Sequence, residues 1–112
     1  MASLPNEFEM AVLEHIAQTT PLLRSAINDL LVCRRVLTGA GSYTYFAPTV
    51  PAAIPDGYLT MDSLIHMPGV PYGMGAALAM TSGYPEFLEL FTYGEELWDG
   101  VDSGFAIASG GG

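Results

Sequence analysis

Acidic and aromatic side chains gather in one short stretch near the C-terminus. Three rings and three carboxylates lie there within nine residues: Phe91, Tyr93, Glu95, Glu96, Trp98 and Asp99. Aromatic rings beside charge are typical anchors of protein interfaces, where their burial carries much of the binding energy. A second interpretation of Trp98 is that its ring folds back onto the core. The chemistry of this stretch is recognition, and we predict that these residues form a partner-binding face.

A second set of side chains could bind a small molecule or transfer a proton. Its members are Tyr43, Tyr45, Tyr58 and His66. Phenol and imidazole groups serve as acids and bases when a cleft brings them together. We therefore keep, as an alternative, a ligand pocket or a minor enzyme site in a cleft between helices and sheet. A histidine at the rim of a sheet explains His66 equally well.

The segment TGAGSYTYF places Gly39 and Gly41 one residue apart, as phosphate-binding loops do. Such a loop needs a helix directly after its glycines, and a P-loop also needs a lysine. Here a strand pattern follows, and the chain has no lysine. The two glycines therefore predict a turn or bulge, with positive φ or a close approach of two backbones.

The remaining chemistry-bearing residues predict neither a metal nor a cofactor. No group of His, Cys and acidic residues has zinc spacing, and residues 95–102 lack the pattern of a calcium loop. Cys33 is the single cysteine, and we expect it to be buried and inert within a strand. With no secretory signal in view, the pattern favours a cytoplasmic protein without catalytic activity.

The charge balance constrains the partner. Twelve acids against three arginines give a formal net charge of −9, and no basic residue follows Arg35. Direct binding to nucleic acid is disfavoured, whereas a protein with a basic surface is attracted. Only 13% of residues are charged while 50% are hydrophobic, so we expect a second copy to cover apolar surface, as a homodimer. No apolar run is long enough to cross a bilayer.

Periodicity predicts two helices at the start of the chain. Asn6 and Glu9 have capping-box spacing ahead of an amphipathic segment over residues 7–18. Thr20 and Pro21 then predict the start of a second amphipathic helix.

From Val32 onward the period changes to two, which indicates strands. The expected strands are VCRRVL, with SYTYF as its continuation or its hairpin partner, then YLTMDSLIHM, MGAALAMT, EFLELFTY and FAIAS, with a hairpin turn at SGYP. We predict an α+β fold in which two N-terminal amphipathic helices pack on a mostly antiparallel sheet of about five strands. The domain covers residues 1–109, and residues 110–112 form a flexible glycine tail.

The segments RRVLTGAGSYTYFAP and LELFTYGEELW carry a resemblance. They resemble a family of small, functionally unassigned bacterial proteins. In that family a strand enters a T-G-x-G-aromatic turn, and a late strand carries L-E-x-aromatic-T-Y-G-E before a tryptophan. The resemblance implies one small domain and supplies no activity.

The leading hypothesis is a non-enzymatic interaction protein of the inhibitor, immunity or adaptor type. It would present its acidic, aromatic face to a protein partner. Mimicry of nucleic acid is a related version, which needs carboxylates arranged in two rows.

Overall fold

The computed structural model describes residues 3–48, 51–94 and 96–108. Helix α1 (Glu7–Thr19) begins where the capping box predicts: Asn6 accepts a hydrogen bond from the Glu9 N–H, and the Glu9 carboxylate accepts one from the Asn6 N–H, each at 2.8 Å. The expected second helix is present but short. It starts as a 3-10 turn (Pro21–Leu23) and continues as α2 (Arg24–Ile27).

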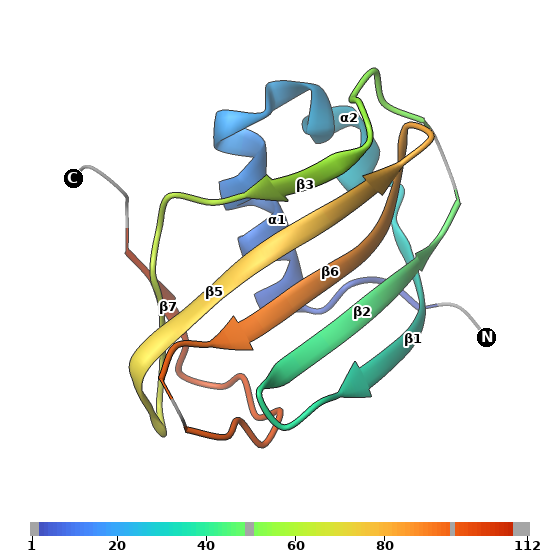
Figure 1. Cartoon of the computed structure of the whole chain (residues 1–112). Coiled ribbons are helices and arrows are strands. Elements are labelled where there is room, and N and C mark those ends of the chain that lie inside the picture. Colours follow the sequence, from blue (N-terminus) through green and yellow to red (C-terminus); the bar gives the residue numbers. More distant parts are fainter. Residues whose placement is uncertain (1–2, 49–50, 95, 109–112) are drawn as a thin grey trace.

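In the described part of the chain seven strands follow, rather than about five. They are β1 (Leu31–Leu37), β2 (Gly41–Ala47), β3 (Gly57–Thr60), β4 (Ile65–Met67), β5 (Val70–Thr81), β6 (Tyr84–Thr92) and β7 (Ala106–Ile107). All pairs are antiparallel, in the order β1-β2-β6-β5-β4-β7, and β3 also pairs with β5. The α+β class is therefore confirmed (Figure 1).

The extra strands come from the length of β5. This strand has 12 residues, so β3 pairs with its second half and β4 with its first half. The segment expected to be one strand, YLTMDSLIHM, is consequently two short strands separated by residues 61–64. The turn between β4 and β5 consists of Pro68 and Gly69 alone, because β5 already begins at Val70.

Glycine shapes the hairpins as expected. Gly39 turns the chain between β1 and β2 with φ +85°, and Gly41 brings two backbones together. A Cβ on Gly41 would lie 1.7 Å from the carbonyl oxygen of Leu90, so only glycine fits there. Ser82 (φ 54°) and Gly83 (φ 83°) close the β5–β6 hairpin, with positive φ at both turn residues, as a two-residue type I′ turn requires.

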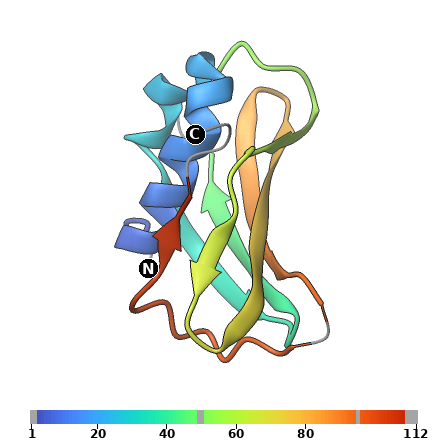
Figure 2. The same cartoon turned by 90° about the vertical axis from the view of Figure 1, so that its left-hand side faces the viewer.

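The helices cover one face of the sheet, which we call the inner face, and leave the other open (Figure 2). The core lies between them and contains Phe8, Leu13, Ile16, Leu78 and Leu88, all at most 2% exposed. The inner residues of β2 and β6 alternate with outward ones, as a half-buried strand requires.

Cys33 departs from the expectation of a buried residue. The β1–β2 register shifts between Val32 and Arg34, so Cys33 lies at a bulge and is exposed. A bulge inserts one residue without a partner and interrupts the alternation of faces, which the sequence pattern did not reveal.

Candidate functional site

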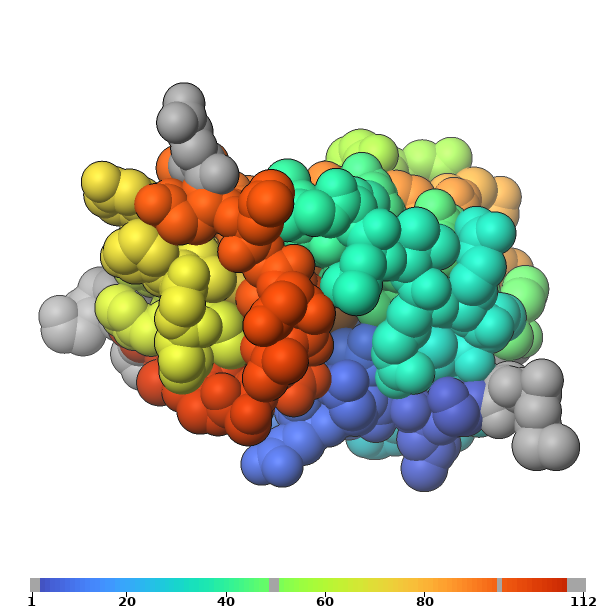
Figure 3. Space-filling model, turned by 90° about the horizontal axis from the view of Figure 1, so that it is seen from below, coloured from blue at the N-terminus to red at the C-terminus, as the bar shows by residue number. Residues whose placement is uncertain are grey.

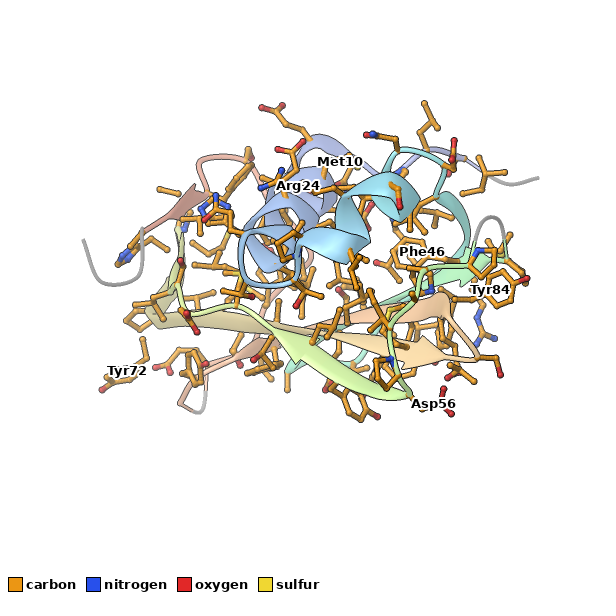
Figure 4. All side chains as sticks on the ribbon, turned by 90° about the horizontal axis from the view of Figure 1, so that it is seen from above. Met10, Arg24, Phe46, Asp56, Tyr72 and Tyr84 are labelled. Carbon is orange, nitrogen blue, oxygen red and sulfur yellow. The ribbon has the colours of Figure 1, made fainter. Side chains whose placement is uncertain are left out.

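The open side of the sheet carries two groups of contacting aromatic rings, one around Phe87 and one of Phe91 with Tyr93, which together we call the aromatic face. Its members are Tyr43 and Tyr45 on β2, Tyr58 on β3, Phe87 and Phe91 on β6, and Tyr93 just after it. Phe87 lies at the centre, with ring centroids 5.4 Å from Tyr43, 5.7 Å from Tyr45 and 6.2 Å from Tyr58. Figure 4 shows side chains projecting from this side with no layer of helix or strand over them.

Small residues on β5 let the rings lie close to the sheet. Ala79 pairs with both Tyr58 and Phe87, and Gly75 pairs with Phe91. A Cβ on Gly75 would lie 2.5 Å from the Tyr93 hydroxyl and 2.7 Å from the Phe91 ring. Phe91 and Tyr93 meet edge-on at 5.6 Å directly above this glycine. The aromatic face is thus seated on the small outward residues of β5, Gly75, Ala77 and Ala79.

Two charged groups lie within or beside the aromatic face. Arg34 stacks over the Tyr45 ring at 4.4 Å from its centroid. The Tyr43 hydroxyl donates a hydrogen bond to Glu89 at 3.2 Å. The charge of Glu89, followed by that hydrogen bond, raises the pKa of Tyr43 above its ordinary value, so the phenol stays neutral and keeps its proton.

The structure brings together three of the four predicted ligand-pocket residues, but on the wrong side for a cleft. Tyr43 and Tyr45 stack at 6.2 Å and, with Tyr58, surround Phe87 on the open face. The predicted cleft between helices and sheet therefore does not contain them. His66 lies on β4 opposite Ala106, and no ring contact joins it to the tyrosines among the described residues.

The residues predicted as the acidic partner face are divided. Phe91 and Tyr93 belong to the aromatic face, and Glu95 lies outside the described residues. Trp98 is only 6% exposed: its ring meets Phe8 edge-on at 6.1 Å, and its indole N–H donates to the Val101 carbonyl at 2.9 Å. Trp98 therefore folds back onto the core and offers no surface anchor.

The two remaining acids of that set, Glu96 and Asp99, lie on either side of Trp98 in the loop that follows β6. Asp99 is exposed, and its carboxylate accepts a hydrogen bond from the Val101 N–H at 2.9 Å. Glu96 is half-buried, and its Oε2 is a buried atom without a hydrogen-bond partner among the described residues. Neither carboxylate lies among the rings of the aromatic face.

A second feature lies on the inner side of the sheet, and we call it the polar pocket. This cavity of about 310 Å³ opens between the start of α1, the β1–β2 hairpin and the loop that carries Trp98. Figure 3 shows the hollow from below, between the blue, teal and orange-red segments. Its lining residues are Asn6, Phe8, Glu9, Arg35, Val36, Leu37, Ser42, Thr44, Leu90, Trp98, Asp99, Gly100 and Asp102.

A fully paired carboxylate lies in the wall of the polar pocket. Arg35 donates to both oxygens of Glu9, at 2.7 and 2.8 Å, and the Thr44 hydroxyl donates to it at 2.8 Å. Burial raises the pKa of Glu9, but the hydrogen bonds from Arg35, the Asn6 N–H and Thr44, together with the charge of Arg35, outweigh it. The pKa of Glu9 therefore lies below its ordinary value.

Sequence reasoning found only half of this cluster. Glu9 was identified as the capping-box residue, but nothing in the chain links it to Arg35, 26 residues away. The available signal was a charged residue on the inward side of a strand: Arg35 pairs with Thr44, and both face the helices. A buried acid was then needed to balance it.

The described residues hold no group of three or more His, Cys, Asp or Glu that could bind a metal, and no helix among them is long and apolar enough to cross a membrane. Comparison with protein-family models, curated proteins and solved structures gives no match. The aromatic face and the polar pocket are therefore the two features from which a function can be inferred.

Proposed function

We propose that this is a non-enzymatic interaction protein of the inhibitor, immunity or adaptor type, and that the aromatic face binds a protein partner with a basic surface. The observation that carries the proposal is a sheet face of contacting rings that no other described segment covers (Figure 4). Large exposed apolar patches mark interaction sites, and tyrosine and arginine are enriched among the residues that dominate binding energy.

The exposure of the rings supports this assignment. Tyr58 is 64% exposed and Tyr93 is 46% exposed, whereas Phe87 and Phe91 are each half-buried. Half-buried rings are already held by their neighbours, so a partner orders few side chains when it binds. Reduced loss of side-chain entropy favours affinity.

The net charge of the chain indicates which kind of partner binds to the aromatic face. The chain carries a net charge of −9, so two copies repel each other over long range, whereas a basic protein is attracted and steered to the surface. A basic partner is therefore our choice over a second copy. The homodimer stays a prediction that light scattering on the purified protein tests directly.

The test is capture of a partner from lysate of the source cell by the wild type and by variants. Tyr58→Ser combined with Tyr93→Ser removes the two most exposed rings of the aromatic face. The expected result is a loss of affinity of about tenfold or more, because truncating a central aromatic anchor costs about 1–2 kcal/mol or more. Binding should also weaken as salt rises.

The matched control is Leu4→Ser combined with Leu22→Ser, which removes two apolar side chains of similar exposure, 70% and 59%, away from the aromatic face. This variant should capture the partner as the wild type does. Equal capture by both double variants would reject the aromatic face. Loss of binding in Glu89→Gln alone, with the ring variants unaffected, would instead favour mimicry of nucleic acid by carboxylates.

A further inference from the structure

The polar pocket has no part in the function proposed above, since its sheet residues Arg35, Ser42 and Thr44 belong to the inner face, opposite the aromatic face. Its walls combine an apolar part with a charged part. Phe8, Leu37 and Trp98 supply apolar surface, whereas Arg35 and three carboxylates supply charge. A volume of about 310 Å³ is that of a pocket for a small ligand or a single side chain.

The positive charge of Arg35 in the pocket is already neutralised by carboxylates of the same chain. Arg35 is bound at both oxygens of Glu9, and the same carboxylate accepts the Asn6 N–H at the start of α1. The carboxylate of Asp102 also attracts Arg35 and accepts a bond from the Asn6 side chain at 3.3 Å. An incoming anion would have to displace an internal one, so the pocket does not favour anions.

Negative charge remains after this pairing. Four ionised groups line the pocket, one positive (Arg35) and three negative (Glu9, Asp99 and Asp102), which leaves a net charge of −2. Asp99 accepts only the Val101 N–H, in its own loop. Its carboxylate keeps acceptor capacity for a cation within the pocket.

Ser42 gives the second, independent indication of a ligand. It lines the pocket, it is 7% exposed, and its hydroxyl makes no side-chain hydrogen bond within the described residues. Ser42 faces the helices because it pairs with Leu37 and Leu90 on the inner side of the sheet. The hydroxyl oxygen is not itself a buried atom without a partner; it opens into the pocket, where it can accept a bond from a bound group.

We propose that the polar pocket binds a protonated primary amine on a short aliphatic chain. The methylene groups would lie against Phe8, Leu37 and Trp98, and the ammonium group would reach Asp99, Asp102 and the Ser42 hydroxyl. An ammonium has three donors, which matches these three acceptors. The same chemistry occurs in a free alkylamine and in a lysine side chain of another polypeptide.

Trp98 supplies the measurement, because it is the chain's single tryptophan and lies in the pocket wall. The protein is titrated with n-butylammonium, n-butanol and butyrate, three probes of similar size and different charge, and Trp98 fluorescence is followed together with the amide signal of Ser42. The expected result is saturable binding of n-butylammonium. The other two probes should bind at least about tenfold more weakly, because hydrogen bonds to charged groups are the stronger ones.

Variants separate a built site from general acidity. Asp99→Asn combined with Asp102→Asn should weaken n-butylammonium binding at least about tenfold. Asp29→Asn combined with Asp62→Asn changes net charge equally outside the pocket and should leave binding unchanged. Ser42→Ala, which keeps the fold's packing, should weaken binding about threefold or more, as expected for one lost hydrogen bond.

The opposite outcomes would overturn the proposal. Equal weakening by the two double variants would mean that only overall acidity attracts the amine. Equal binding of the three probes would mean that only the apolar part of the pocket binds them. A preference for butyrate would mean that Arg35 can bind an anion in spite of its pairing with Glu9.

A fourth probe, Nα-acetyl-lysine methylamide, distinguishes the two sources of the amine. Binding as tight as that of n-butylammonium points to a lysine side chain, and exclusion of this bulkier probe points to a free amine. Either result keeps the proposed chemistry. Tyr58→Ser with Tyr93→Ser should bind n-butylammonium normally, so this test is independent of the aromatic face.

Discussion

The inner and outer faces of the sheet differ less in apolar character than in what covers them. Along β6, Leu88 and Leu90 point inward and are at most 2% exposed, whereas Phe87, Glu89 and Phe91 point outward and are half-buried. An antiparallel sheet with one open face usually carries polar residues on that face. Here the open face carries rings instead, which is the composition of a contact surface rather than of a solvated one.

The same comparison holds for the two adjacent arginines of β1. Arg35 points inward and is tied to a buried carboxylate, whereas Arg34 points outward and rests on a tyrosine ring. Of these two neighbouring arginines, one therefore stabilises the fold through an ion pair and the other lies on the surface. The difference shows that charge type alone does not indicate role, and that the face of the strand does.

The largest expected contrast is between Leu88→Ala and Phe87→Ala. Leu88 is fully buried, so its truncation should cost about 2–5 kcal/mol of unfolding free energy, whereas Phe87→Ala, at a half-exposed position, should cost at most about 2 kcal/mol. Urea unfolding followed by circular dichroism measures both. Equal losses would mean that the aromatic face is a second core and not a surface held open for a partner.

The next contrast is between Arg35→Met and Arg34→Met. Loss of Arg35 leaves the Glu9 carboxylate buried without its main partner, so the unfolding free energy should fall by about 2–3 kcal/mol. This is less than the full value for a buried ion pair, because the Arg35 side chain is 42% exposed. Arg34→Met removes one exposed cation–π contact and should cost less than about 1 kcal/mol. A reversed order would break the assignment of faces on β1.

Glu9→Gln sharpens the comparison through pH. The pKa of Glu9 is depressed in the folded state, so its charged form stabilises the protein above the ordinary carboxyl pKa, and that stabilisation is lost as pH falls through the lower, folded value. The difference in unfolding free energy between wild type and Glu9→Gln should therefore shrink on acidification from neutral pH. A difference that stays constant across this range would contradict the paired carboxylate.

The smallest effect on stability is expected for Tyr58→Thr. Threonine, like tyrosine, is common in strands, and Tyr58 is 64% exposed, so the unfolding free energy should change by less than about 0.5 kcal/mol. Partner affinity should nevertheless fall. A thermal melt beside a binding titration measures both, and a large loss of stability without a change in affinity would remove Tyr58 from the interaction surface.

Local patterns in the sequence predicted the local structure well. The capping box at Asn6, the Ser82–Gly83 turn and the close approach at Gly41 all follow from residue type and spacing, and all are present. The alternation of side chains along the strand expected at SYTYF also places Tyr43 and Tyr45 on one face, where their rings stack.

What the sequence left open depends on long-range contacts. Alternation does not say which face of β2 meets the helices, so the tyrosines were expected in a cleft and lie on the open side. The Glu9–Arg35–Thr44 cluster joins residues 26 and 35 positions apart, and no local pattern encodes such a pairing. Trp98 had two interpretations, and its contact with Phe8 decides for the core.

The β5–β6 hairpin also has a consequence for how the chain folds. Its pairs run from Met74 with Thr92 to Thr81 with Tyr84, so all are close in sequence, whereas the contact between Tyr43 and Glu89 spans 46 residues. Local hairpins close within about 1–10 μs, before distant strands dock, because little loop entropy is lost. Phe87 and Phe91 are then exposed early on an unpaired strand edge. Glu89 between them places a charge inside the segment most prone to aggregate, and so acts as a gatekeeper during folding.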